Sequence, residues 1–116
     1  MSLYFDLVRT GKYDDNGEVF TDCVFSANIT HNLNKMAMAV DIYVPLWRPE
    51  EKGFTKAEDI IEQVELGLEE LKSNPKKYKE YDSDNGWGLY IHFVPWVEDV
   101  LKACKEHPKA IIEISR

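Results

Sequence analysis

Three short stretches contain most of the side chains that could bind a ligand. They are N-I-T-H-N at 28–32, L-W-R at 46–48 and N-G-W-G at 85–88. Their amides, hydroxyl and imidazole provide directional hydrogen bonds, the guanidinium matches an anion, and the tryptophans offer flat apolar faces. The candidate ligand-binding residues are Asn28, Thr30, His31, Asn32, Trp47, Arg48, Asn85 and Trp87.

Each stretch lies where one expected element ends and another begins, so unbonded backbone amides accompany the side chains. Taken singly, each stretch also has a local interpretation, which we favour. Asn28 or Thr30 would cap a helix. Trp47 would anchor a loop with Arg48 paired to a nearby acid, and Trp87 would pack at the start of the last long helix. A binding site therefore requires that folding brings the three stretches together.

A catalytic alternative rests on the histidines. In a small hydrolase or transferase, His31 or His92 would act as general base while Arg48 holds an anionic substrate. Cys104 lies three residues before His107, but its place on an apolar stripe favours an inert core thiol.

We expect no metal and no cofactor. The three histidines do not have the spacing of zinc ligands, and the chain has no glycine-rich phosphate loop. The D-S-D-N-G stretch at 82–86 resembles the start of a calcium loop, but its twelfth position is Phe93, which has no carboxylate.

Length, composition and charge limit the class of protein. The 116 residues suit one domain, 1–116, with a single modest core, and 44% hydrophobic residues indicate a folded chain. A formal net charge of −7 argues against nucleic acid as a partner, because binding to phosphates needs a basic face. We expect a small molecule or a protein as partner, and a homodimer through an open sheet edge is a further option.

The chain has no apolar run of membrane-spanning length and no leader pattern. We therefore expect a cytoplasmic protein without a membrane partner. Its two cysteines, Cys23 and Cys104, are expected to be reduced there, and their spacing does not indicate a disulfide.

The N-terminal quarter predicts a β-hairpin. Residues Leu3–Val8 and Val19–Phe25 have strand-like composition, and the D-N-G sequence at 15–17 is typical of a turn. From His31 as far as Tyr43, apolar residues recur every three or four positions, which predicts one helix.

Proline then shapes the connection. Residues 44–53, which contain Pro45 and Pro49, predict a loop because proline disfavours the interior of a helix. A capping box from Thr55 to Glu58 predicts the start of the next helix. Its buried residues are predicted to be Ile60, Ile61, Val64, Leu68 and Leu71, and Asn74-Pro75 ends it, with one more helical turn possible before residue 81.

After Gly88 two interpretations compete. One helix from about Trp87 to Glu106, kinked at Pro95, keeps a single apolar stripe on both sides of the proline, and we favour it. Alternatively, Leu89–Val94 is a strand. With a final strand at Ala110–Ser115, the order of elements predicts an α+β fold: a small antiparallel or mixed sheet, made of the hairpin and the C-terminal strand, covered by about three helices.

Several stretches, in their order along the chain, resemble a family of small uncharacterised proteins found in phages and bacteria. They are N-I-T-H-N-L-N-K-M-A, L-W-R-P-E-E, N-P-K-K-Y-K, N-G-W-G-L-Y-I-H-F-V and I-I-E-I-S-R. The resemblance covers about Val24 to Arg116. It implies a single-domain, phage-related or bacterial cytoplasmic protein, and it brings no activity, cofactor, partner or catalytic residue.

The leading hypothesis from the sequence is a non-catalytic module that binds a small molecule or a partner protein through the NITHN, LWR and NGWG stretches. The enzyme described above is the alternative. A third hypothesis is a structural or regulatory phage protein whose acidic surface binds a basic host partner.

Overall fold

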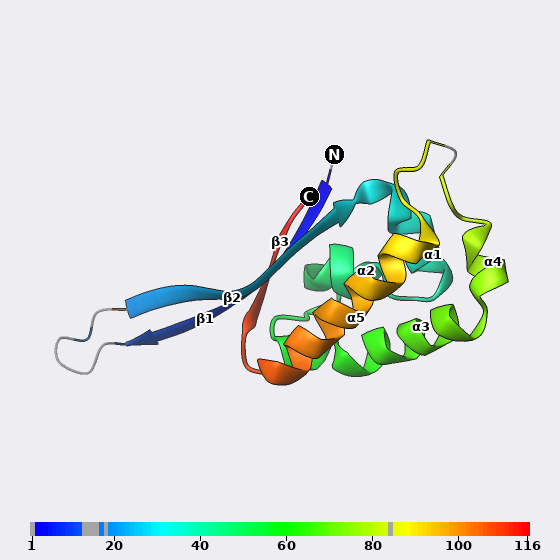
Figure 1. The fold of residues 1–116 in the computed structure, drawn as a ribbon. Helices are drawn as coiled ribbons and strands as arrows, with labels where there is room; N and C mark the ends of the chain where they lie inside the picture. Colours follow the sequence, from blue (N-terminus) through cyan, green and yellow to red (C-terminus); the bar gives the residue numbers. More distant parts are fainter. Residues whose placement is uncertain (1, 13–16, 18, 84) are drawn as a thin grey trace.

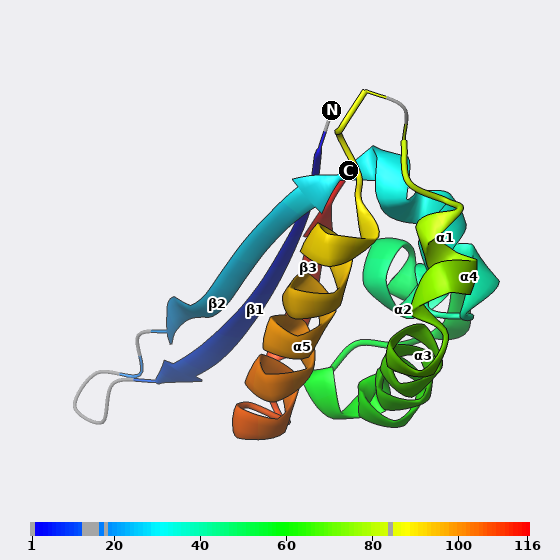
Figure 2. The same cartoon turned by 45° about the vertical axis from the view of Figure 1, so that its right-hand side comes forward.

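The computed structural model describes residues 2–12, 17, 19–83 and 85–116. Its sheet has three strands, β1 (Ser2–Lys12), β2 (Val19–Thr30) and β3 (Ile111–Ser115), in the order β2-β1-β3, and both pairs are antiparallel. Helices pack on one face of the sheet (Figure 1 and Figure 2). The predicted α+β fold is therefore confirmed. Of the predicted turn at 15–17, residues 15 and 16 lie outside the described residues.

Alternation along β1 decides which face of the sheet is buried. Leu3, Phe5 and Leu7 are fully buried under the helices, whereas Tyr4 between them is 47% exposed on the other face. In the neighbouring strand β2, residues 25–29 alternate in the same way, and Phe25 pairs with Leu7 on the buried face. The register shifts between Leu7 and Val8, which leaves one extra residue in β2 as a β-bulge.

Part of the hairpin extends beyond the rest of the molecule. β3 pairs with β1 only as far as Val8, so residues Arg9–Lys12 of β1 pair with Val19–Asp22 of β2 alone. We call these two segments the arm. The arm projects away from the helices (Figure 1), and the molecule measures 56 × 27 × 23 Å. A Cβ on Gly11 would lie 2.5 Å from the ring of Phe20, so that ring lies across the glycine.

The segment from 31 to 47 contains three short helices rather than the single helix predicted for 31–43. They are the 3₁₀ turn η1 (His31–Leu33), α1 (Asn34–Ala39) and α2 (Tyr43–Trp47). The chain breaks at Asp41, whose φ of 63° is left-handed and cannot continue a right-handed helix. The periodicity was misleading because apolar residues on both sides of this turn enter the same core.

The loop predicted for 44–53 is also partly wrong, because α2 and the 3₁₀ helix η2 (Pro49–Lys52) occupy most of it. Pro45 lies in the first turn of α2 and Pro49 is the first residue of η2, positions whose N–H groups have no intrahelical partner. Gly53 then ends η2 in the left-handed conformation, at φ 72°.

The next helix, α3 (Ile61–Ser73), follows a 3₁₀ turn, η3 (Ala57–Asp59). The capping acid is Asp59 rather than the predicted Glu58: its carboxylate accepts hydrogen bonds from the backbone N–H of Thr55 at 2.9 Å and of Lys56 at 3.0 Å. The predicted stripe lies against the core, with Ile61 only partly buried. After Asn74 the short helix α4 (Pro75–Lys79) forms the predicted extra turn.

The last helix, α5 (Tyr90–Glu106), runs through Pro95. The favoured single helix is confirmed, although it begins at Tyr90 rather than at about Trp87, and the strand alternative for Leu89–Val94 is wrong. The stripe predicted for α5 is buried in the core, and Trp96 packs edge-on against Phe5 of β1 at a ring-centroid distance of 6.4 Å.

Candidate functional site

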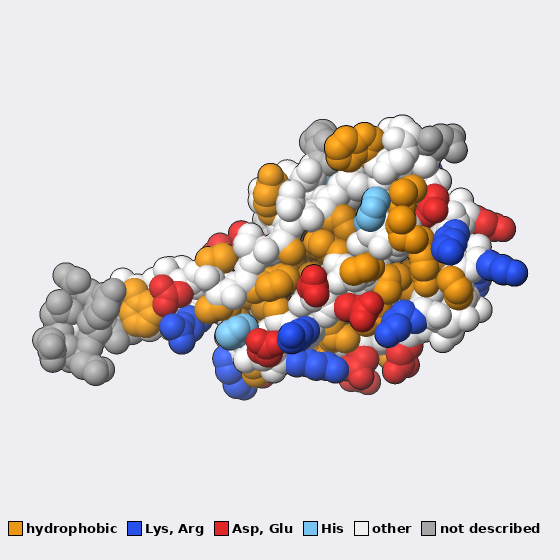
Figure 3. Space-filling view, in the orientation of Figure 1, with side chains coloured by type: hydrophobic (Ala, Val, Ile, Leu, Met, Phe, Trp, Pro, Cys, Tyr) orange, Lys and Arg blue, Asp and Glu red, His pale blue; other side chains and the backbone are white. Residues whose placement is uncertain are grey.

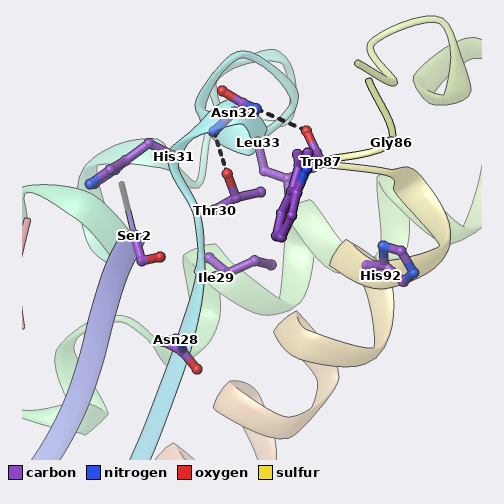
Figure 4. Close-up of a pocket in the computed structure, with 11 residues that line it drawn as sticks. Ser2, Asn28, Ile29, Thr30, His31, Asn32, Leu33, Gly86, Trp87 and His92 are labelled. Carbon is purple, nitrogen blue, oxygen red and sulfur yellow. Dashed lines mark hydrogen bonds between the residues drawn. The ribbon is translucent and has the colours of Figure 1, made fainter. Parts of the chain in front are cut away.

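An open hollow of about 1060 Å³ lies between the end of β2, the turn η1 and the loop that precedes α5. In Figure 4 the Trp87 ring lies between two elements. The end of β2 is on one side, and the first turn of α5, which carries His92, is on the other. The hollow is lined by Ser2, Asn28, Ile29, Thr30, His31, Asn32, Leu33, Gly86, Trp87, Gly88 and His92.

The first wall of the hollow comes from the NITHN stretch, whose first three residues continue β2 rather than starting a helix. Asn28 is therefore a strand residue with an exposed side chain and not a helix cap. Thr30 does cap, because its hydroxyl accepts a hydrogen bond from the backbone N–H of Asn32 at 3.4 Å. Ile29 is partly buried and gives this wall an apolar part.

The second wall is the NGWG loop, and its backbone is held at several points. The Asn85 side-chain oxygen accepts from the backbone N–H of Trp87 at 3.0 Å. The Ser83 hydroxyl donates to the Trp87 carbonyl oxygen, and the Ser83 N–H donates to the Gly88 carbonyl oxygen at 3.3 Å. Both polar groups of the Trp87 backbone are thus bonded within the protein.

The two walls are joined directly. The side-chain amide of Asn32 donates to the Trp87 carbonyl oxygen at 3.0 Å. Gly88 is buried beside the same asparagine, with φ at 103°, and a Cβ there would lie 2.9 Å from the Asn32 Cβ. Only glycine fits this contact without a shift. Of the three stretches whose convergence a binding site would require, NITHN and NGWG therefore meet.

The Trp87 side chain does not pack in the core. It is 69% exposed, the highest value among the exposed large hydrophobic side chains of the described residues. The predicted packing at the start of the last helix is thus wrong, because α5 begins at Tyr90 and is preceded by a loop that turns the indole outward.

The LWR stretch contacts the site through the buried Trp47, which bonds to His31. Trp47 is 2% exposed, and its indole N–H donates to Nδ1 of His31 at 3.2 Å. Its ring stacks on Tyr43 with centroids 5.6 Å apart. Trp47 thus fixes the His31 ring from the core side and does not line the hollow.

Arg48 lies outside the hollow as well. Its Nε donates to the Tyr43 hydroxyl at 3.2 Å and its Nη1 lies 3.6 Å from the Glu51 carboxylate. The Tyr43 hydrogen bond, with smaller contributions from Glu51 and Glu50, raises the pKa of the Arg48 guanidinium. The guanidinium is therefore engaged on a different part of the surface from the two converging stretches.

Asn85 faces the other side of the NGWG loop. It lines a second hollow of about 530 Å³ with His31, Asn32 and Lys35, together with Asn34, Tyr81 and Ser83. Because its side chain is bonded to the Trp87 N–H and to Ser83, its role in the structure is to hold the loop.

Among the described residues, those that line the main hollow have hydrogen-bonding groups but no carboxylate. His31 is oriented by an indole N–H rather than by an acid, and the exposed imidazole of His92 forms no hydrogen bond within the part of the chain that the structure describes. The thiol of Cys104 is buried, which raises its pKa to about 12. Among the described residues, no group of three or more His, Cys, Asp or Glu side chains could hold a metal ion.

Some lining residues were not among the sequence candidates. Ser2 and Ile29 reach the hollow because β1 and β2 pair in the register Ser2 with Thr30 and Leu3 with Ile29, which no local pattern specifies. The anchoring role of Ser83 was also missed. Its signal was present in the sequence, since Ser83 and Asn85 flank a turn and such side chains bond nearby backbone groups.

Comparison of the chain with family models, curated proteins and solved structures finds no match. No helix among the described residues is both long and apolar enough to cross a bilayer.

Proposed function

We propose that this protein is a non-catalytic binding module whose ligand occupies the hollow between the end of β2 and Trp87. The ligand class that fits is a small molecule with a flat apolar body and hydrogen-bonding groups on its edge. We further propose that the chain belongs with the phage and bacterial proteins that its motifs resemble.

One observation carries the proposal: an exposed indole on a fixed backbone. Trp87 is 69% exposed, although its N–H and carbonyl groups are bonded to Asn85, Ser83 and Asn32. A large apolar ring left in water loses the free energy that burial would give, roughly 25 cal/mol per Å². A rigid, preformed position also lowers the entropy cost of ligand binding.

The groups around this ring support the same ligand class. The side chains of Asn28 and His92 are exposed at the hollow and form no hydrogen bond within the described residues, so these side-chain donors and acceptors can bind a ligand. Ile29 and Leu33 add apolar wall. An apolar-walled hollow with a few directional polar groups is the usual form of a small-molecule site.

The enzyme alternative has less support. It needs Arg48 beside a histidine that acts as base, and Arg48 is bonded to Tyr43 and Glu51 outside the hollow. A carboxylate that orients the histidine ring would also support the enzyme hypothesis. The ring of His31 is instead held by the indole N–H of Trp47.

A thermal-shift screen of planar metabolites and nucleobases tests the proposal. The expected result is a set of ligands that raise the melting temperature of the wild type, with shifts lost in Trp87→Ala and reduced in Asn28→Ala. The control is Leu66→Ala, which removes a side chain 61% exposed on α3 and should keep the shifts. Shifts that survive in a folded Trp87→Ala variant, or no shift with any compound, would contradict the proposal.

A further inference from the structure

The outer edge of β2 is unusually open for pairing. The strand has 12 residues, V-F-T-D-C-V-F-S-A-N-I-T, with one charged residue, no lysine and no proline. Natural proteins protect edge strands by keeping them short or by placing lysine, other charges or proline in them. Of the described residues Val19 and 21–29, none forms a backbone-to-backbone hydrogen bond outside the sheet. Such an edge is a template for another strand.

The arm adds apolar surface that a monomer leaves in water. Val19 is 65% exposed, and the arm stands clear of the body in the space-filling view (Figure 3). The radius of gyration is 15.3 Å, whereas a compact domain of this length has about 13 Å. An arm of this kind is stabilised when it lies against another surface.

The β-bulge makes the two halves of β2 complementary to each other. On the body side, Phe25 and Ile29 face the helices. On the arm side, Phe20 pairs with Gly11, and alternation along β1 puts both on that same face. Without the extra residue, Phe20 and Ile29 would lie on opposite faces. With it, an antiparallel copy can place Phe20 opposite Ile29, apolar on apolar.

We propose that the partner of this edge is a second copy of the chain, with the two β2 strands paired antiparallel about a two-fold axis. The two three-stranded sheets then form one continuous sheet, and each arm lies on the body of the other copy. In this register the pairs between the copies are Val19 with Thr30, Phe20 with Ile29, Thr21 with Asn28, Asp22 with Ala27 and Cys23 with Ser26.

Charge does not oppose this contact locally, although each chain has a net charge of −7. The one acid of β2 is Asp22, whose carboxylate lies 3.2 Å from the Arg9 guanidinium of its own chain. The paired strands therefore bring no uncompensated charge together.

The dimer has a consequence for the hollow, which the end of β2 lines. In the proposed register, Val19–Thr21 of the second copy lie beside Asn28–Thr30, at the open side of the hollow near Trp87. The arm of each copy would thus supply a wall that the other copy's site lacks. This inference goes beyond the proposed function and does not depend on it, because association is measured without any ligand.

Sedimentation and register-specific cross-linking test the dimer. Cys23 is free and exposed, and it faces Ser26 of the second copy across the proposed interface. We expect the wild type to sediment at twice the mass of one chain at micromolar concentrations. We expect mild oxidation to link Ser26→Cys chains into covalent dimers through Cys23 and the new thiol, and Val19→Glu to weaken the association several-fold.

The matched control is Ser115→Cys, which makes the same exchange on β3, at the opposite edge of the sheet. It should not cross-link. A second pair of variants, Thr21→Cys mixed with Asn28→Cys, both in a Cys23→Ser background, tests the register if Ser26→Cys does not fold. A monomer at all concentrations, a dimer that links through position 115, or a dimer that links at neither β2 pair would overturn the proposal.

Discussion

The side-chain amide of Asn32 donates a hydrogen bond to the carbonyl oxygen of Trp87, across 55 positions of sequence. This bond joins the end of the sheet to the loop before the last helix and fixes the backbone from which the Trp87 indole projects. The two asparagines of the NITHN stretch therefore have different roles. Asn32 holds the Trp87 loop, whereas the Asn28 side chain forms no hydrogen bond within the described residues and is a ligand contact in the function that we propose.

Replacing these two asparagines should separate stability from binding. Asn32→Ala should lower the free energy of unfolding by about 1 kcal/mol, because an intramolecular hydrogen bond is lost. It should also make the Trp87 ring more mobile. Asn28→Ala should leave unfolding nearly unchanged and weaken ligand binding. Urea denaturation and tryptophan fluorescence anisotropy measure the two effects, and equal destabilisation by both substitutions would contradict this division of roles.

The regular elements were predictable because their signals are local. The hairpin strands, α3, α5 and β3 follow from alternation, from helical periodicity and from proline and asparagine at the ends. The break at Asp41 was not predictable in this way. It depends on the approach of α3 to the 40–42 turn, a contact between distant segments that periodicity does not encode.

The candidate site also has features that local sequence patterns predict and features that they do not. The boundary positions of Asn28, Asn32 and Trp87 identified the stretches that meet, because local patterns locate the ends of elements. The role of Trp47 could not be read locally, since it depends on a hydrogen bond to His31, 16 positions earlier in the chain. The exposure of Trp87 depends on the exact residue where α5 begins, the feature that sequence patterns define least well.

Gly67 should not tolerate a methyl group. It is buried in α3, and an added Cβ would overlap Cγ2 of Ile42 and lie 2.9 Å from the Val40 carbonyl oxygen. Alanine normally stabilises a helix interior relative to glycine, but overpacking costs about 1–3 kcal/mol. Gly67→Ala should therefore lower the unfolding free energy measured in urea. Leu66→Ala is the neighbouring control and should change the unfolding free energy by less than about 1 kcal/mol. A stabilised Gly67→Ala protein would show that α3 lies further from the turn at residues 40–42.

Asp59 should contribute acid-sensitive stability. Backbone hydrogen bonds from Lys56 and Thr55 lower the pKa of its carboxyl. A carboxyl with a lowered pKa in the folded state stabilises the protein above its unfolded pKa of about 4, and this stabilisation is lost as the pH falls through the folded pKa. Asp59→Ala should cost about 1 kcal/mol at neutral pH, and less as the pH falls below 4. Glu58→Gln, which affects only the surface ion pair with Lys109, should have a smaller effect at neutral pH.

The two thiols should differ strongly in reactivity. Cys23 is exposed, whereas burial raises the pKa of Cys104 to about 12, so its reactive thiolate is scarce at pH 8. A chromogenic disulfide reagent should label one thiol per native chain quickly and the second only on unfolding. Cys23→Ser should remove the fast phase. Rapid labelling of Cys104 in the folded protein would show that this part of the core is open.

The three tryptophans allow the most direct test of the proposed binding site. Each indole N–H gives its own signal in a ¹H–¹⁵N spectrum, and Trp87→Phe identifies the signal from the hollow. During titration with planar fragments, we expect saturable shifts of the Trp87 signal and small changes for the core residues Trp47 and Trp96. Fragments that bind while the Trp87 signal stays fixed, or a Trp87 signal that no planar fragment moves, would contradict the central claim.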